Sequence, residues 1–259
     1  MSKSRRRRRK PWLARGLPAR LWKRLGVQPW LRRQAKRLRK PALMLLAVLA
    51  LGIVVLSRLE APPRNPEDLC AIFGEKREWY LSARQAQADW GVPEAVQMAI
   101  IYQESSFRAR ARPRRRILWI FPGPRRSSAY GYAQALDSTW AQFQRDTDQP
   151  RAGRHRFADV TQFVGWYAGE IHRLTGIAHD DAYRLYLAYH EGPGGYARGT
   201  YTKKAWLMQT ARKVEARAAR YQRQYDACQD RLQRWSGWRW IAVALLGAGT
   251  WWLYRRLRP

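Results

Sequence analysis

Two apolar segments lie near the ends of this 259-residue chain. The first, at residues 41–58, reads PALMLLAVLALGIVVLS before Arg58 and carries no charged side chain up to that point. A helix of this length falls slightly short of the hydrocarbon core of a bilayer, and the flanking Lys40 and Arg58 side chains can reach the headgroups. We predict a transmembrane helix over residues 41–58. A cleaved signal peptide is disfavoured because no A-x-A-like cleavage site follows Leu56.

The second apolar segment, at residues 238–254, contains the stretch WIAVALLGAGTWWLY. Tryptophans stand at both of its ends, and tryptophan and tyrosine concentrate at the two interfaces of a membrane. The pattern predicts a helix over residues 238–254. This helix either crosses the membrane or lies along its surface, because its apolar core is short.

The sequence between these segments has apolar side chains three or four positions apart, the spacing of amphipathic helices. Pro93 suits a first helical turn, Asp137 an N-cap and Gly176 a C-cap. One segment, RILWIF at residues 116–121, resembles a strand, and with Pro122-Gly123-Pro124 as a turn it predicts a short hairpin. The expected fold is mainly α: a helical domain at residues 69–234 after a proline-rich linker at 59–68, with helices near residues 75–89, 94–107, 137–145, 159–175, 180–191 and 202–230.

Most of the net charge of +31 lies before the first apolar segment. Residues 1–57 hold 17 Lys and Arg side chains and no Asp or Glu, whereas residues 59–238 hold 28 basic and 19 acidic side chains. Basic residues beside a membrane span remain in the cytoplasm and attract anionic lipid. We therefore expect a cytoplasmic arm over residues 1–40 at the inner (cytoplasmic) membrane, with the domain on the periplasmic side. The run Arg5–Arg9 would also suit nucleic acid, but the adjacent apolar segment favours lipid, so no nucleic-acid partner is expected.

The two cysteines, Cys70 and Cys228, lie near the two edges of the predicted domain. Their surroundings fit no zinc or redox motif, since neither belongs to a C-x-x-C pair or lies beside a histidine. They are either buried free thiols or a disulfide that closes the domain, and a disulfide requires an oxidising compartment. No metal and no other cofactor is expected. The zinc motif H-E-x-x-H fails because Gly194 stands four positions after His190.

Glu104 is the first candidate for chemistry. Val96, Ile100, Glu104 and Phe107 fall on one face of the predicted helix at 94–107, so Glu104 continues an apolar stripe. Burial disfavours the charged form and raises a carboxyl pKa, which is how a glutamate becomes a general acid near neutral pH. By position alone, a solvated or paired glutamate at a helix end is the commoner case.

Three motifs give Glu104 a context. They are Glu104-Ser105-Ser106-Phe107, Ala129-Tyr130-Gly131-Tyr132-Ala133-Gln134 and Ala188-Tyr189-His190-Glu191-Gly192-Pro193-Gly194, in this order. Together they resemble the lytic transglycosylase domain of the soluble-lytic-transglycosylase (SLT), goose-lysozyme-like family, over about residues 79–201. The resemblance implies a lysozyme-like helical domain that cleaves the bond between N-acetylmuramic acid and N-acetylglucosamine in peptidoglycan strands.

The resemblance also assigns roles. It implies that Glu104 is the catalytic acid/base, that Gln134 lines the sugar cleft, and that Tyr189 lies close to Glu104 with Ser105 hydrogen-bonding nearby. It implies a reaction in which the glutamate first protonates the glycosidic oxygen and then accepts the proton of the muramyl C6 hydroxyl. That hydroxyl closes on C1, giving a 1,6-anhydro sugar without consuming water.

The sequence departs from the family pattern at three places. Tyr132-Ala133 stands where Leu-Met is usual, and His190-Glu191 replaces Asn-Ala, which adds two ionisable groups to the substrate-binding candidates at the cleft rim. The segment between Glu104 and Gly131 is longer than usual and contains eight arginines. We interpret residues 108–128 as a hairpin packed on the domain, a flap whose arginines bind stem-peptide carboxylates, or a contact with anionic lipid.

Two other functions fit the same residues. A water-using lysozyme would need a second carboxylate, for which Glu191 and Asp137 are candidates. A degenerate domain would bind glycan strands without cleaving them. The many aromatic side chains do not decide between these functions. They recur mostly at helical spacing, which is more typical of a core than of sugar platforms: Trp140, Phe143, Phe163, Trp166, Tyr167, Tyr183 and Tyr186.

Overall fold

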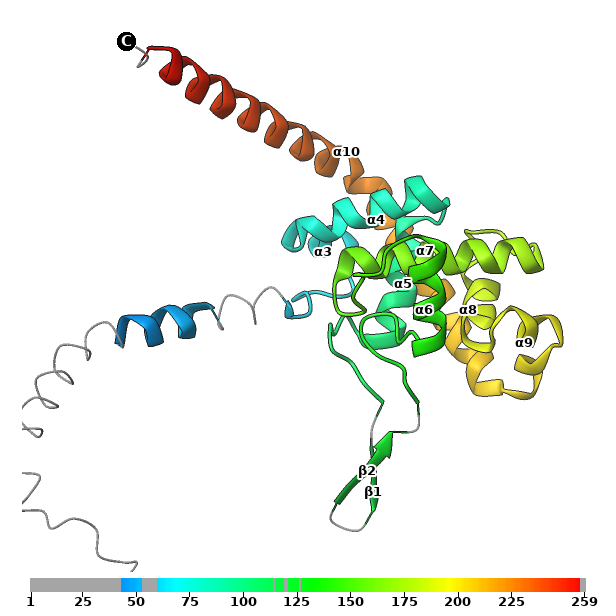
Figure 1. Ribbon diagram of the computed structural model, residues 1–259. Coiled ribbons are helices and arrows are strands. Elements are labelled where there is room, and N and C mark those ends of the chain that lie inside the picture. The colour runs from blue at the N-terminus through cyan, green and yellow to red at the C-terminus, as the bar shows by residue number, and fades with distance from the viewer. Residues whose placement is uncertain (1–42, 53–59, 114, 119–120, 126, 257–259) are drawn as a thin grey trace, which may run out of the picture. The chain divides into compact units, whose positions relative to one another are not determined.

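The computed structural model of the protein describes residues 43–52, 60–113, 115–118, 121–125 and 127–256 (Figure 1), with the backbone alone for the hairpin strands and for residues 235–256. The chain divides into two units, residues 1–59 and 60–259. In the first unit residues 43–52 are helical, as predicted. The rest of the predicted helix at 41–58 and the basic arm at 1–40 lie outside the described residues. Among the described residues, none of the helices combines the length and apolarity that a membrane crossing requires.

The second unit is mainly helical, which confirms the expected fold class. Its elements are α3 (Leu69–Glu75), α4 (Arg77–Trp90), α5 (Glu94–Ser105), α6 (Asp137–Asp146), α7 (Phe157–Thr175), α8 (Ala182–Glu191), α9 (Pro193–Ala197), the 3-10 helix η2 (Thr200–Lys203) and α10 (Ala205–Arg256). The segment at 238–254 is helical, as predicted, and forms the last part of α10. Its relation to a membrane stays a prediction.

The helix ends predicted from glycine are correct, whereas the helix start predicted from Asp137 is not. Gly91 and Gly176 end α4 and α7 in the left-handed conformation, with φ of 75° and 72°. The predicted N-cap role of Asp137 is wrong, because Asp137 is already helical and its carboxylate pairs with Arg154 at 2.6 Å. The cap of α8 is Asp181, whose side chain accepts from the Arg184 amide, so the helix predicted from residue 180 begins at Ala182.

Three other predicted helices have different bounds. The helix predicted at 75–89 is α4 and begins at Arg77, because Lys76 has a non-helical backbone that separates it from α3. The helix predicted from residue 159 begins at Phe157. The long basic helix predicted over 202–230 begins at Ala205, after η2, and continues without a break to Arg256.

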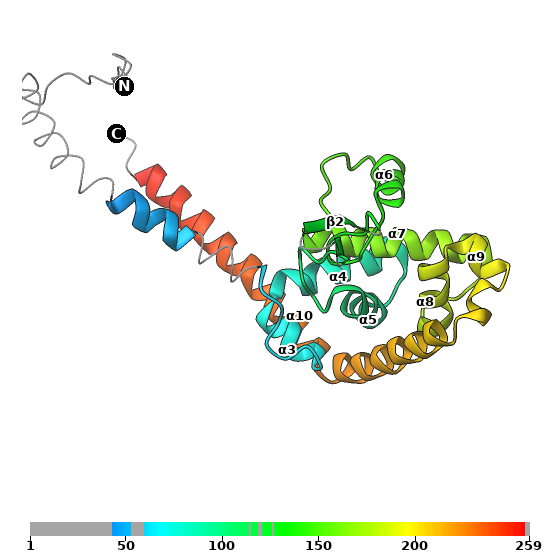
Figure 2. The ribbon, with the colours of Figure 1, turned by 90° about the horizontal axis from the view of Figure 1, so that it is seen from below.

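Helix α5 is the centre of the domain. It packs against α10, α4 and α7, and Figure 2 shows it with α4 and α7 on one side and α10 on the other. Nine of its twelve residues are buried, including Met98, Ile100 and Ile101. The aromatic stripe expected in the core is there: Trp140, Phe143, Phe163, Trp166 and Tyr186 are buried, whereas Tyr167 and Tyr183 are partly buried. A side chain at the end of α5 is therefore held by a helix that is closely packed against three others.

A disulfide between Cys70 and Cys228 joins α3 to α10, with the two Cα atoms 6.2 Å apart. Of the two alternatives that the sequence left open, the structure has the disulfide that closes the domain. Polar contacts reinforce the junction: the Leu69 amide donates to Gln224 Oε1 at 2.9 Å, and Arg217 pairs with Glu67 at 2.7 Å. Two segments about 150 residues apart in sequence are thus fastened together.

The segment between α5 and α6 contains an antiparallel hairpin of β1 (Arg115–Leu118) and β2 (Phe121–Arg125). Leu118 pairs with Phe121, so the predicted turn at 122–124 is wrong and these residues belong to β2. A two-stranded ribbon leaves each strand with a free edge, which tolerates prolines that cannot donate to a ladder. The register is irregular between Arg115 and Ile117, where one strand has an extra residue.

Candidate active site

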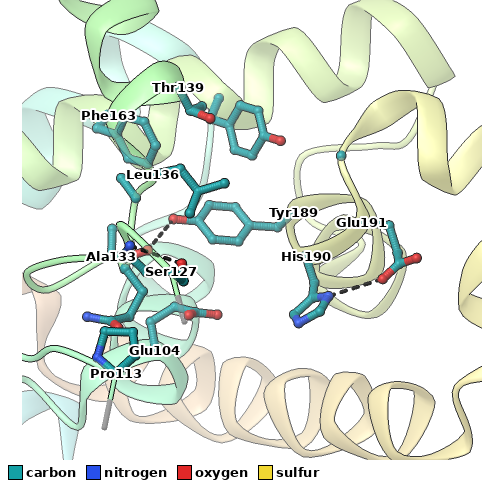
Figure 3. A pocket seen from close by; sticks show the side chains of 15 residues that line it. Glu104, Pro113, Ser127, Ala133, Leu136, Thr139, Phe163, Tyr189, His190 and Glu191 are labelled. Carbon is teal, nitrogen blue, oxygen red and sulfur yellow. Dashed lines mark hydrogen bonds and ion pairs between the residues drawn. The ribbon is translucent and has the colours of Figure 1, made fainter. Parts of the chain in front are cut away.

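A cleft of about 600 Å³ opens at the C-terminal ends of α5 and α8. Its wall also includes residues from the loop before α6 and from α7 (Figure 3). In Figure 3, Glu104 and Pro113 lie on one wall, and His190 and Glu191 on the other. The described residues that line the cleft are Glu104, Pro113, Ser127, Ala129, Ala133, Gln134, Ala135, Leu136, Thr139, Phe163, Tyr167, Tyr189, His190, Glu191 and Gly192.

Glu104 is the penultimate residue of the central helix α5. The chain leaves this helix abruptly, because Ser106 and Phe107 both have a positive φ, 51° and 58°. The Phe107 ring is fully buried and packs against Trp79 with a centroid distance of 5.4 Å. This anchored turn ends the helix one residue after Glu104 and leaves the Glu104 carboxyl group at the cleft.

Burial raises the pKa of Glu104 to about 7. A hydrogen bond from the Tyr186 hydroxyl favours the carboxylate and opposes part of that rise. The direction expected from the apolar stripe is therefore confirmed. Near neutral pH, Glu104 holds a proton part of the time and can both donate and accept one.

Tyr189 lies beside Glu104, as the resemblance implied. Its hydroxyl donates to the Ala133 carbonyl at 2.9 Å, a bond drawn in Figure 3 that joins α8 to the turn before α6. Burial and the nearby Glu104 carboxylate raise the pKa of Tyr189 well above its usual value. Tyr189 therefore stays a neutral hydrogen-bonding group that spans the two sides of the cleft.

Gln134 lines the cleft, and the hydrogen bonds of its amide nitrogen also hold the wall of the cleft together. Nε2 donates to the carbonyls of Gly131 at 2.8 Å and Ala111 at 3.0 Å. The turn depends on Gly131, which has a φ of 80° and at which a Cβ would lie 1.9 Å from the Arg154 carbonyl oxygen. Gln134 itself adopts a positive φ of 49°. The glutamine amide thus fixes the shape of the turn that faces Glu104.

Ser105 has a different position from the one implied by the resemblance. Its side chain is buried, and the hydroxyl donates to the Ile101 carbonyl one turn earlier in α5 at 3.1 Å. It is absent from the described lining of the cleft. The backbone carbonyl of Ser105 accepts from Arg108 Nε at 3.0 Å, so this residue helps to end α5.

His190 and Glu191 line the wall opposite Glu104, and the Glu191 carboxylate already accepts hydrogen bonds from other side chains of the domain. Its side chain is 5% exposed and accepts from Lys204 Nζ at 2.6 Å, from the Thr200 hydroxyl, and from His190 Nδ1 at 3.1 Å. The hydrogen bonds from Lys204 and Thr200 lower the pKa of Glu191 to about 2. Glu191 is therefore a permanently charged anchor for the cleft rim.

The cleft thus brings together one titratable carboxyl group and one fixed carboxylate. Glu191 is a poor base for activating a water, since three donors already stabilise its charged form and its pKa is lowered to about 2. Asp137, the other candidate for a second catalytic carboxylate, pairs with Arg154 and is not among the described lining residues. In the part of the chain that the structure describes, no group of three or more His, Cys, Asp or Glu side chains is arranged to hold a metal ion.

Sequence reasoning missed two contributors to this site. Tyr186 was assigned to the core stripe, although its hydroxyl also interacts with Glu104. Its position one helical turn before Tyr189 on α8 was a usable signal, because residues three apart share a helix face. Lys204 lies 13 residues beyond Glu191, and nothing in its sequence context indicated the contact.

The arginine-rich segment borders the cleft at both of its ends, through Pro113 and Ser127. Its first arginines have partners within the domain. Arg110 pairs with Glu60 at 2.7 Å, and the Arg112 guanidinium lies 4.1 Å from the centre of the Tyr130 ring. The interpretation of residues 108–128 as a flap stays a prediction. The position of Pro113 and Ser127 beside the cleft is consistent with it.

A family model described as "Transglycosylase SLT domain" matches residues 42–228 of the chain. No curated protein and no solved structure matches significantly. The matched range includes the whole cleft, both cysteines, and every residue assigned a role above.

Proposed function

This chain belongs to the transglycosylase SLT domain family, and on that premise we propose that it is a membrane-anchored lytic transglycosylase. Family membership implies transglycosylase activity on peptidoglycan. The proposed reaction cleaves the bond between N-acetylmuramic acid and N-acetylglucosamine and leaves a 1,6-anhydro end. The observation that carries this proposal is Glu104, the one carboxyl group among the described cleft residues that titrates near neutral pH, with its pKa raised to about 7.

In the proposed mechanism Glu104 begins protonated and donates its proton to the glycosidic oxygen as the C1–O bond breaks. The substrate's own N-acetyl oxygen bonds to C1 in place of a second protein carboxylate, as in substrate-assisted glycosidases, and this bond breaks when the C6 oxygen attacks C1. The Glu104 carboxylate then accepts the proton of the C6 hydroxyl, whose oxygen bonds to C1. The electron pair of the broken bond stays on the leaving oxygen, Glu104 regains its proton, and no water is consumed.

The neighbours of Glu104 suit this two-step use. An apolar environment favours the protonated form that starts the reaction, and the Tyr186 hydroxyl stabilises the carboxylate that exists between the two steps. Tyr189 keeps the opposing wall at a fixed spacing through its bond to Ala133. These features favour one group acting first as acid and then as base.

The two alternatives differ from this proposal in their products. A lysozyme would leave reducing ends, and its second carboxylate is hard to supply when Glu191 is held by Lys204 and Thr200. A glycan-binding scaffold would release nothing. Incubating purified peptidoglycan with the full-length protein and identifying the released muropeptides by mass spectrometry separates the three. We expect 1,6-anhydro ends; a predominance of reducing ends, or no release, would reject the proposed reaction.

We expect Tyr186→Phe to move the alkaline limb of the pH profile to higher pH. Activity (kcat/KM) depends on protonated Glu104 in the free enzyme, so it falls as pH rises through a pKa of about 7. Removing the hydroxyl that favours the carboxylate raises that pKa further, and the acid form persists to higher pH. The measurement is kcat/KM between pH 5 and 9. Tyr183→Phe, a partly buried tyrosine of the same helix outside the described cleft lining, is the matched control and should not shift the limb.

We also propose that the protein is held at the inner membrane with the domain on the periplasmic side. Three observations support this proposal: the basic arm at 1–40, the apolar segments at 41–58 and 238–254, and the Cys70–Cys228 disulfide. A disulfide is typical of an oxidising compartment. Proteinase K added to intact spheroplasts should digest the domain and leave a protected fragment carrying an N-terminal tag. A domain that is digested only after the membrane is permeabilised would contradict this orientation.

A further inference from the structure

We propose that Trp206 and His190 form an outer sugar-binding subsite that extends the cleft away from Glu104 along the rim. The inference rests on the proposed function, since it concerns the glycan strand on which the enzyme would act. It adds a binding position at the start of α10, outside the motifs that carry the family resemblance.

The exposure of Trp206 needs an explanation. The residue is 56% exposed, and among the described residues it is the one Trp, Tyr or Phe with a large exposed surface. Tryptophan is usually well buried, because its indole has a large apolar surface and a single polar N–H group. Isolated exposed apolar residues are common, so the exposure alone decides nothing. Its position relative to the cleft is what matters.

Trp206 lies directly beside the described lining of the cleft. Its ring contacts His190 edge to face, with centroids 5.2 Å apart and planes at 78°. His190 is itself a lining residue on the wall opposite Glu104. The exposed indole is therefore the direct neighbour of a residue that lines the cleft, and it is not an isolated surface side chain.

The Glu191 carboxylate fixes the two segments that carry Trp206 and His190. It binds Lys204, two residues before Trp206, at 2.6 Å and also accepts from Thr200 in η2 and from His190 in α8. One nearly buried carboxylate thus joins the end of α8, η2 and the segment that leads into α10. A ring whose neighbours are fixed in advance loses little conformational entropy when a ligand binds.

The pair has the two features that a sugar ring requires. Trp206 offers an apolar ring surface for the C–H face of a pyranose, and His190 offers a polar nitrogen for a hydroxyl or acetamido group. Because Nδ1 of His190 is engaged by Glu191, the second ring nitrogen, Nε2, is the one left for a ligand. A mostly apolar surface with one oriented polar group is the usual composition of a small-molecule site.

The test compares purified glycan strands of increasing length as substrates for the full-length protein. With Trp206→Ala we expect KM for long strands to rise roughly tenfold with little change in kcat, the order expected for losing one aromatic stacking contact. The effect should diminish as the strand is shortened. Trp206→Phe should retain most of the affinity, and Trp206→Leu should resemble Trp206→Ala, because stacking requires a flat ring. Leu174→Ala is the matched control, since Leu174 is 54% exposed and does not line the described cleft.

Three results would overturn the subsite. They are an unchanged KM in Trp206→Ala, an equal loss at every strand length, and full activity of Trp206→Leu. Loss of binding to anionic vesicles with an unchanged KM would assign Trp206 to a lipid contact and also overturn it. A wild-type protein that cleaves no glycan would instead reject the proposed function. Measuring strand binding by calorimetry in a Glu104→Gln background, with and without Trp206→Ala, keeps the two failures apart.

Discussion

Glu104→Gln is expected to lower the rate of peptidoglycan cleavage by roughly three orders of magnitude or more, while glycan binding and the fold persist. Loss of a general acid or base typically costs about 10²–10⁴ in rate, and here one group performs both roles. Glutamine keeps the size of the side chain but cannot donate to the glycosidic oxygen as an acid or accept the C6 proton. The measurement is the initial rate of muropeptide release with purified full-length protein. Activity near the wild-type level would remove the basis of the mechanism.

Glu94→Gln is the matched control, because Glu94 is a second buried glutamate of the same helix. It is 2% exposed, accepts from the Tyr225 hydroxyl at 2.9 Å, and burial raises its pKa as it does that of Glu104. Glu94 lies at the opposite end of α5 and is not among the described cleft residues. Its replacement should leave cleavage close to wild type. Equal losses in the two variants would indicate a general effect of removing buried charge.

The difference in stability between Glu104→Gln and the wild type should also depend on pH in a defined direction. A carboxyl whose folded pKa is raised is tolerated when protonated, below its unfolded pKa of about 4.3, and disfavours the fold as pH rises through about 7. Glutamine has no such dependence. The free energy of unfolding of the variant, relative to wild type, should therefore be higher at pH 8 than at pH 4. The opposite sign would mean that Glu104 is stabilised as a carboxylate.

Removing the disulfide is expected to have the largest effect on stability. Cys70 and Cys228 are 158 positions apart in the sequence, and closing a loop of that size is worth about 4–5 kcal/mol in the chain-entropy model, as an upper figure. For a domain of this size such a loss lowers Tm by on the order of 10 °C. Cys70→Ser/Cys228→Ser should show this decrease in thermal unfolding followed by circular dichroism.

Reduction supplies the control for this prediction. Dithiothreitol should lower the Tm of the wild type toward that of the double variant and should not change the double variant. The contacts of Glu67 with Arg217 and of Leu69 with Gln224 should keep α3 attached at moderate temperature. Neither cysteine is among the described cleft residues, so kcat at 25 °C should be retained. A difference of only one or two degrees between the Tm of the wild type and that of the double variant would show that these other contacts hold α3 to α10 without the disulfide.

The features that the sequence predicted correctly depend on local chemistry. Glycine tolerates a positive φ, so Gly91 and Gly176 ended helices where the pattern predicted. The apolar stripe through Val96 and Ile100 placed Glu104 in an apolar environment, and the structure agrees, because the stripe follows from helix geometry alone. The cysteine pair was predictable as one of two alternatives, and the fold decided between them.

The features that were missed depend on contacts between distant segments. The apparent second carboxylate, Glu191, is bound by Lys204 and Thr200, and that requires η2 to fold back beside the end of α8. Ser105 lies next to Glu104 in sequence but bonds back to its own helix. The turn of the hairpin was assigned to 122–124 because proline and glycine favour turns, whereas the pairing of Leu118 with Phe121 reverses the chain earlier.

The central claim, that Glu104 drives an intramolecular ring closure without water, is tested most directly by digestion of purified peptidoglycan in H₂¹⁸O. The full-length wild type and Glu104→Gln are digested in parallel, and the new sugar ends are analysed by mass spectrometry. The account predicts that the wild type releases anhydro ends free of ¹⁸O and that the variant releases almost none. Wild-type products that carry ¹⁸O at C1 of a reducing end would contradict it, because water would then be the acceptor.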